Sequence, residues 1–310
     1  MFNKSFLTER VVKSLLAKDF DVLLTHGCFD VAAKNLGESR FQRTQRKLML
    51  VKTLMNVDGL APQQALSLRA VSYFMSAYPF VISMKTNREF LSSKMIYSRF
   101  DLPVVTPDMF DSILGEDAYE AHAAKGRHTV AIDAAALRQK RQQMQFTLGE
   151  LAALVGISKK ALYEIEARRV NPTEETMKKM ETTLNIKLHS QYELKSPGET
   201  RVSPAGAFQE KVSKELTRIG VDNSAVCSSP FEIIGKGEFQ AIAGLSINMK
   251  KIRRDAQSVK KISQIFSSKA FYVAKHAEEK EIEGVPIIEE DELPELDSAK
   301  ELKKLIEEKE

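Results

Sequence analysis

The sequence predicts a multidomain α+β or α/β protein in which an all-α helix-turn-helix bundle lies between two similar α/β units. A chain of 310 residues is long enough for two or three domains. The middle of the chain carries helix caps and a turn glycine, and the two flanks repeat one order of helix and strand patterns. With 43% hydrophobic and 28% charged residues, the composition excludes fibrous and wholly disordered proteins.

The central segment begins with an amphipathic pattern that predicts a helix over residues 134–144. The spacing of Thr147 and Glu150 is that of a capping box, in which each side chain binds the backbone N–H of the other. A second helix is therefore expected over residues 148–155. Gly156 follows it and can adopt the left-handed conformation that ends a helix in a tight turn.

A third helix is expected to begin directly after this turn. Ser158 is a good N-cap, and Leu162 and Ile165 supply apolar anchors one turn apart, which leaves the polar side chains between them outside. Two short helices joined by a glycine turn, the second with polar residues at its start, form the layout that inserts a helix into the DNA major groove.

The distribution of charge agrees with this interpretation. Residues 134–190 contain ten basic and six acidic residues, so this segment alone accounts for the net charge of +4 of the whole chain. A basic patch on one domain is the electrostatic footprint of nucleic-acid binding. Two alternatives stay open: the charges form only a solvated face, or the bundle binds another protein.

The run from Thr147 to Glu166, followed by Asn171 and Pro172, resembles the Cro/C1 (Xre-like) helix-turn-helix family. The arrangement of the whole chain is similar to a family of archaeal helix-turn-helix transcriptional regulators that carry such a module inside a longer chain. The resemblance implies a sequence-specific regulator that binds double-stranded DNA as a homodimer, with an unidentified small-molecule effector as a further partner.

The resemblance also implies which residues contact DNA. The start of the third helix would meet base edges, the preceding cap would touch phosphate, and the basic loop after the third helix would approach the backbone. Leu148 departs from the family pattern, because it replaces a polar residue. The expected DNA-binding residues are Thr147, Ser158, Lys159, Lys160, Tyr163, Glu164, Arg168 and Arg169.

The two flanks are predicted to be two copies of one duplicated α/β unit. Each reads as a helix, two β-rich runs, a helix, a short strand and a last strand entered through an X-Pro step. Duplication is the preferred interpretation. The paired segments are 9–16 with 208–219, 28–34 with 230–236, 47–52 with 239–244, 62–77 with 255–268, 80–83 with 270–273, and 102–105 with 285–288.

This order resembles the restriction-endonuclease-like fold, whose enzymes hold Mg²⁺ with an acid on one strand and a Glu-x-Lys on the next. Asp30 and Lys52 fit two of these positions, but Leu50 stands where the second carboxylate belongs. In the second flank Glu232 matches Asp30, and Gly244 stands in place of the lysine. Both flanks are therefore expected to be degenerate, non-catalytic scaffolds for dimerisation or ligand sensing. A Mg²⁺-dependent nuclease remains an alternative function.

Other chemistry is weakly represented. There is no phosphate-binding or zinc-protease motif, so no catalytic residue, metal site or cofactor is expected. Cys28 is interpreted as a buried structural thiol, and His122 and His128 as solvated rather than zinc-binding. No apolar stretch is long enough for a membrane span, which leads us to expect a cytoplasmic protein. A further alternative is an antitoxin-like subunit that binds a protein.

Changes in composition set the expected domain boundaries. The last segment contains leucines at helical spacing, but its charge suggests a largely solvated end. The expected parts are an α/β unit over 1–115, a connector over 116–130, a helix-turn-helix domain over 131–192, a linker over 193–207, a second α/β unit over 208–293 and a charged C-terminal tail over 294–310.

Overall fold

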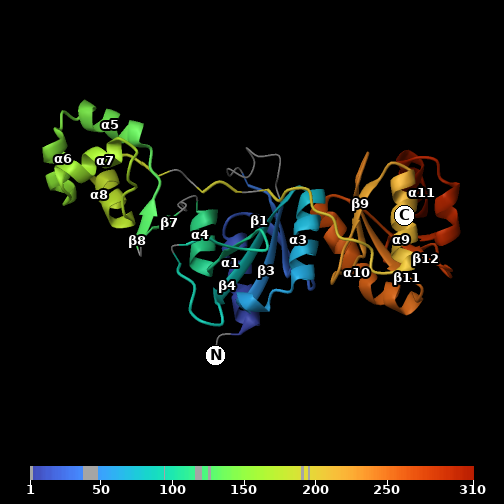
Figure 1. Ribbon diagram of the computed structural model, residues 1–310. Coiled ribbons are helices and arrows are strands. Elements are labelled where there is room, and N and C mark those ends of the chain that lie inside the picture. Colours follow the sequence, from blue (N-terminus) through green and yellow to red (C-terminus); the bar gives the residue numbers. More distant parts are fainter. Residues whose placement is uncertain are drawn as a thin grey trace. The chain divides into compact units, whose positions relative to one another are not determined.

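The computed structural model of the chain (Figure 1) contains two compact units, one inserted into the other. The inserted unit comprises Ser92–Ile96 and Asp108–Glu193, and the remaining segments form the first unit. The structure describes residues 3–37, 48–93, 95–115, 121–124, 127–189, 192–194 and 196–310, without the side chains of 121–124, 127 and 128. The side chains of His122 and His128 therefore lie outside the described part.

The first sheet has six strands in the order β1-β2-β3-β4-β6-β5. β3 and β4 are nearly continuous apolar runs, as expected for neighbouring parallel strands that are covered on both faces. Helix α1 contacts β1 and β3, and helix α3 packs on β4. The elements are α1 (Lys4–Leu16), β1 (Phe20–Leu24), β2 (Val31–Asn35), β3 (Leu48–Asn56), η1 (Val57–Gly59), α3 (Pro62–Phe74), β4 (Ala77–Lys85), β5 (Tyr97–Arg99) and β6 (Leu102–Val105).

The second sheet has the same order and the same strand directions, β9-β10-β11-β12-β14-β13. Its helices also occupy corresponding places in the chain, with α9 before the first strand and α10 between the third and fourth. The elements are α9 (Ala207–Arg218), β9 (Asp222–Ala225), β10 (Ile233–Lys236), β11 (Gln240–Ser246), α10 (Met249–Phe266), β12 (Lys269–Ala274), β13 (Glu281–Ile282) and β14 (Val285–Glu289).

Backbone hydrogen bonds fix the correspondence between the two halves. The N–H of Asp30 donates to Val51 O at 2.8 Å, and the N–H of Glu232 donates to Ala243 O at 3.0 Å. Glu232 therefore occupies the place of Asp30, and Gly244 that of Lys52, as the sequence comparison predicted. The shared strand order and register support the predicted duplication.

The two halves share one hydrophobic core. Helix α3 of the first half contacts β9 and β10 of the second, and helix α10 of the second half contacts β1 and β2 of the first. At their junction the N–H of Cys28 donates to Ser228 O at 2.6 Å. Gly27 has a φ of +129°, and a Cβ there would lie 2.0 Å from that same oxygen, so only glycine permits this approach. The flanks are therefore one body.

The C-terminal segment is part of this body. Leu302 and Ile306 are fully buried, and helix α11 packs on β12 and β14. The expectation of a solvated charged tail over 294–310 is wrong, because the leucine-isoleucine stripe of the helix outweighs its many charges. The additional helical elements of the two halves are η2 (Glu290–Glu295) and α11 (Ala299–Lys309).

The inserted unit begins with α4 (Pro107–Leu114), followed by a two-stranded hairpin and four further short helices. The hairpin falls within the segment predicted as a connector, and the four helices form the helix-turn-helix domain. The helices bury Leu137, Leu151, Leu162, Met180 and Leu184 in one small core. Among the described residues no helix has the length and apolar character needed to cross a membrane. The elements are β7 (Ala121–Ala124), β8 (Arg127–Val130), α5 (Ala134–Gln143), α6 (Leu148–Val155), α7 (Lys159–Glu166) and α8 (Glu174–Leu184).

Candidate nucleic-acid interface

The turn between α6 and α7 has the predicted geometry. The backbone N–H of Glu150 donates to Thr147 Oγ1 at 3.2 Å, and the N–H of Thr147 donates to Glu150 Oε2 at 2.7 Å. Gly156 adopts the left-handed conformation with a φ of +79°, and Ser158 accepts a hydrogen bond from Ala161 N as the N-cap of α7. The predicted caps and turn are confirmed, and they fix where α7 starts.

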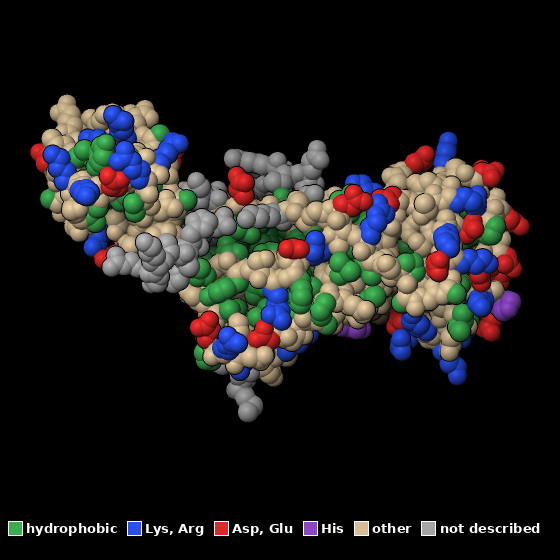
Figure 2. Space-filling view, in the orientation of Figure 1, with side chains coloured by type: hydrophobic (Ala, Val, Ile, Leu, Met, Phe, Trp, Pro, Cys, Tyr) green, Lys and Arg blue, Asp and Glu red, His purple; other side chains and the backbone are tan. Residues whose placement is uncertain are grey.

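Helix α7 separates an apolar face from a basic one. Leu162 and Ile165 are buried in the core of the domain, whereas Lys159 and Lys160 are exposed in its first turn. Among the described residues neither lysine has a hydrogen-bond or ion-pair partner. Figure 2 shows Lys and Arg side chains spread over the visible face of this domain, with apolar side chains between them. The start of α7 thus offers two free ammonium groups to solvent.

A buried ion pair holds α7 against α5. The guanidinium of Arg141 donates to both carboxylate oxygens of Glu166, at 2.6 and 2.9 Å, and to Phe146 O at 2.9 Å. Only 8% of Arg141 is exposed, and the carboxylate raises the pKa of its guanidinium. One of the ten basic residues of the domain is therefore structural, which sequence analysis missed because periodicity alone does not reveal its partner.

The far end of α7 carries a second, exposed cluster. Arg169 lies over the ring of Tyr163, with its Cζ 5.7 Å from the ring centroid, and pairs with Glu164 at 3.3 Å. Arg168 has a φ of +60° and ends the helix in a left-handed turn, which leaves its side chain exposed without a partner in the described part of the chain. Of the two arginines, Arg168 is the one whose charge is not already neutralised.

Thr147 retains one hydrogen-bond function beyond its cap. Its hydroxyl oxygen accepts from Glu150 N, so the hydroxyl proton is free to donate outward from an exposed position. The backbone hydrogen bond from Thr147 lowers the pKa of the Glu150 carboxyl, which keeps this acid ionised and held in the cap. The capping box therefore stays intact while Thr147 faces solvent.

In the first half of the duplicated unit, the acid at the nuclease-like position, Asp30, is paired with two lysines. Asp30, which is 4% exposed, accepts from Lys4 Nζ at 2.8 Å and from Lys52 Nζ at 3.2 Å. Its other oxygen accepts from Thr53 N at 2.9 Å and Thr53 Oγ1 at 3.1 Å. Lys52 also donates to Gly27 O at 2.6 Å. Lys4 was not singled out from the sequence, because it lies on another element.

In the second half, the corresponding acid is held by a different lysine. Glu232 accepts from Leu245 N at 2.6 Å and pairs with Lys251 of α10. Gly244 leaves room for the ring of Tyr272, since a Cβ at Gly244 would lie 2.1 Å from the Cε1 of that ring. Burial raises the pKa of Glu232 above its ordinary value, despite the neighbouring Lys251.

These positions do not fit a Mg²⁺ site. A hard cation needs several oxygen ligands, but both oxygens of Asp30 already accept hydrogen bonds from side-chain or backbone donors, and Leu50 supplies no carboxylate. Among the described residues no three His, Cys, Asp or Glu side chains come together in a way that could hold a metal. Cys28 is buried, as predicted, and burial raises the pKa of its thiol to about 12, so it is no nucleophile.

Comparison with family models agrees with both parts of this architecture. Residues 137–190 match the helix-turn-helix family, and residues 4–119 match the PD-(D/E)XK superfamily domain. The chain therefore carries a Cro/C1-type helix-turn-helix domain together with a nuclease-like α/β domain. The predicted fold class is confirmed.

Comparison with curated proteins extends the similarity to nearly the whole chain. The relatives bear the provisional name HTH-type transcriptional regulatory protein, and they come from archaea. One from Methanothermobacter thermautotrophicus is 27% identical, over 99% of this chain and 98% of the relative. One from Archaeoglobus fulgidus is 26% identical, over 98% and 97%. No solved structure matches the chain.

Proposed function

We propose that the protein is a sequence-specific DNA-binding transcriptional regulator that acts as a homodimer. The observation that carries this proposal is the exposed start of α7, where Lys159 and Lys160 have no partner among the described residues of a Cro/C1-type domain. The names of the archaeal relatives support a role in transcription.

In this proposal the first turn of α7 reads bases in the major groove. Lys159 and Lys160 donate to guanine O6 or N7, and Ser158 lies beside them at the helix start. Tyr163 and Glu164, one turn later, are held by Arg169 and contact the edge of the site. Thr147 and Arg168 donate to phosphates, which positions the domain without reading sequence.

The dimer is expected to use a surface other than the one that joins the two halves. The faces of α3 and α10 are already buried against the opposite half of the same chain. Two helix-turn-helix domains, one from each chain, would then span half-sites about 34 Å apart, one turn of B-DNA.

The direct test is selection of bound fragments from random duplex DNA at a stated salt concentration, followed by binding measurements with variants. Lys159→Ala and Lys160→Ala should each reduce discrimination between the selected and a mutated site by about 1–3 kcal/mol. Lys179→Ala is a matched control, because Lys179 is an exposed lysine of α8 that pairs with Glu175. Equal loss on all sequences for the α7 variants would contradict base reading.

Arg168→Ala should weaken binding to every sequence alike and reduce the dependence of log K on log salt by about one unit. Arg169→Ala should have the smaller effect of the two, because Glu164 already neutralises Arg169. A palindrome among the selected fragments, and a dimer by analytical ultracentrifugation, would support the two-fold arrangement. A monomer at the concentration that saturates DNA would contradict it.

The nuclease-like half is expected to be inactive. Incubation of the full chain with supercoiled DNA and Mg²⁺ or Mn²⁺ should leave the DNA uncut, because Asp30 is engaged by two lysines and the second carboxylate is missing. Cleavage that disappears in Asp30→Asn would favour the enzyme alternative. A protein partner that co-purifies in fixed ratio and blocks DNA binding would favour an antitoxin-like role.

A further inference from the structure

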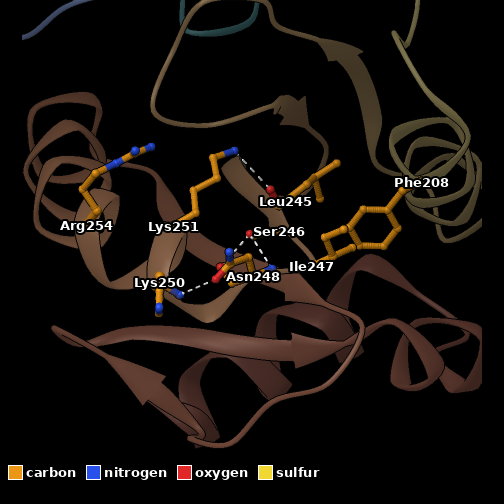
Figure 3. A pocket seen from close by; sticks show the side chains of 8 residues that line it. All are labelled: Phe208, Leu245, Ser246, Ile247, Asn248, Lys250, Lys251 and Arg254. Atoms are coloured by element: carbon orange, nitrogen blue, oxygen red, sulfur yellow. Dashed lines mark hydrogen bonds between the residues drawn. The ribbon is translucent and has the colours of Figure 1, made fainter.

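A pocket of about 690 Å³ lies in the second half, at the carboxyl end of β11 and the first two turns of α10. This volume is within the range of roughly 300–1,000 Å³ typical of small-molecule sites. In open α/β sheets, ligands bind in crevices beyond the carboxyl ends of strands. The pocket is lined by Phe208, Leu245, Ser246, Ile247, Asn248, Lys250, Lys251 and Arg254 (Figure 3).

The charged lining of this pocket has one sign. It includes three cationic side chains and no acidic one. Lys250 and Arg254 are four residues apart on α10 and so share one helix face. The ammonium group of Lys250 has no partner among the described residues, and the side chain of Arg254 is 73% exposed although it pairs with Asp255. Lys251 donates to Leu245 O (Figure 3) and pairs with Glu232, so its charge is already engaged within the protein.

Two of these cations, Lys250 and Lys251, lie in the first turn of α10, where a helix disfavours positive charge. The N-terminus of a helix carries a partial positive charge, so acidic residues normally occupy its first turn. Helices α8 and α11 follow this rule with Glu174 and Glu301. Helix α10 has no acid in its first turn, as is also true of α1, α3, α5 and α7, and it carries Lys250 and Lys251 directly after Met249. A bound anion would relieve this repulsion.

The other side of the pocket is apolar. Phe208 approaches from α9, and Ile247 is 74% exposed at the end of β11, which is an unfavourable position for an isoleucine in water. Between the two sides, Ser246 Oγ donates to Asn248 O at 2.8 Å and accepts from Asn248 N at 3.0 Å, and these two hydrogen bonds stabilise the turn. The site therefore combines a cationic wall with an apolar one.

The duplicated half provides an internal comparison for this turn. Asn56 caps Asp58 N through its side chain at 2.9 Å, and Asn248 caps Lys250 N in the same way at 2.9 Å. Asp58 thus stands where the second half has Lys250. Asp58 is bound by Arg99 Nη1 at 2.8 Å and Asn87 N at 2.7 Å, which satisfies it within the protein. The same turn is neutralised internally in one half and left cationic in the other.

We propose that this pocket binds a small organic anion, a carboxylate or phosphate attached to an apolar group, with Lys250 and Arg254 on the anion and Phe208 and Ile247 on the apolar part. It is the site at which an effector would act. Binding is measured without DNA, so its outcome is independent of the proposed DNA recognition.

The test is titration calorimetry of the full chain with phenyl phosphate and 3-phenylpropionate, which represent the two anion types. Saturable binding of at least one probe at one site is expected. Binding by inorganic phosphate and by phenol should each be at least about tenfold weaker, because each has only one of the two features. No saturable binding of either probe, or equal binding of inorganic phosphate, would overturn the proposal.

Lys250→Asp is the decisive variant, because it installs the residue of the first half at the corresponding position. It should weaken binding of the probe by at least about tenfold by placing a like charge on the anion. Its thermal midpoint should be unchanged or higher, since an acid suits the helix N-terminus. Lys261→Asp, the same exchange farther along α10 and outside the lining, should retain binding. Equal loss in both variants would overturn the assignment.

Discussion

The two halves of the duplicated unit share one strand order and register, but they pair the corresponding acids, Asp30 and Glu232, with lysines from different elements. In the first half Asp30 is a buried acid paired with Lys52 from the adjacent strand β3. In the second half the strand lysine is replaced by Gly244, Tyr272 fills the space, and Lys251 approaches Glu232 from α10 instead. The comparison shows that both halves retain an acid paired with a lysine directly before β2 or β10, whereas the lysine comes from a different element in each half.

The largest expected effect concerns the more buried pair. Asp30→Ala would leave the ammonium of Lys52, whose side chain is 5% exposed, without its counter-ion, and should reduce the free energy of unfolding by about 3–5 kcal/mol. Denaturation in urea measures this loss. The double variant Asp30→Asn/Lys52→Met removes both charges and should lose clearly less. If the double variant lost as much free energy of unfolding as Asp30→Ala, the unpaired charge of Lys52 would not be the cause of the loss.

An intermediate effect is expected at Gly244, where the second half accommodates the ring of Tyr272. Gly244→Ala places a Cβ against the ring of Tyr272 and should reduce the free energy of unfolding by about 1–3 kcal/mol through overpacking. Register places Val81 of the first half at the position of Tyr272. Tyr272→Val should therefore relieve the clash, and the double variant should be more stable than the sum of the two losses predicts. If the losses in the free energy of unfolding were strictly additive, the Cβ at position 244 would not clash with the ring of Tyr272.

The smallest effect is a pH dependence specific to the second half. The raised pKa of Glu232 means that ionising this acid costs more in the folded than in the unfolded chain, and Gln imitates the protonated form. The advantage of the wild type over Glu232→Gln should therefore decline as pH rises from the ordinary value of 4.5 toward the higher folded pKa. Urea denaturation between roughly pH 4 and pH 7 checks the sign. An advantage that grows with pH would mean that Lys251 outweighs burial.

Much of this architecture could be predicted from local sequence. The caps at Thr147 and Ser158 and the turn at Gly156 are encoded within a few residues, and each is found where it was predicted. The repeated order of apolar runs gave the correct alignment of Asp30 with Glu232, because strand register follows the apolar pattern.

The features that escaped sequence analysis depend on distant partners. The edge strand β1 is short and mixes Asp21 with an exposed Leu24, so its pattern is weak. The sequence gives no sign that Arg141 differs from the other basic residues of the domain, because its partner Glu166 lies on another helix. The residues that line the proposed anion pocket come from α9, from α10 and from the end of β11. The apolar pattern of the sequence does not predict that Phe208 and Lys250 lie close together.

The junction between Cys28 and Ser228 bears on how the chain is made. A ribosome completes the first half and then the whole inserted domain before it begins the strands against which α3 will pack. Translation proceeds at about 5–20 residues per second, so many seconds pass before the strands that cover Ala65, Leu68 and Val71 are synthesised. Fragments that stop after the inserted domain should therefore aggregate or recruit chaperones, even though every residue expected to touch DNA is already present.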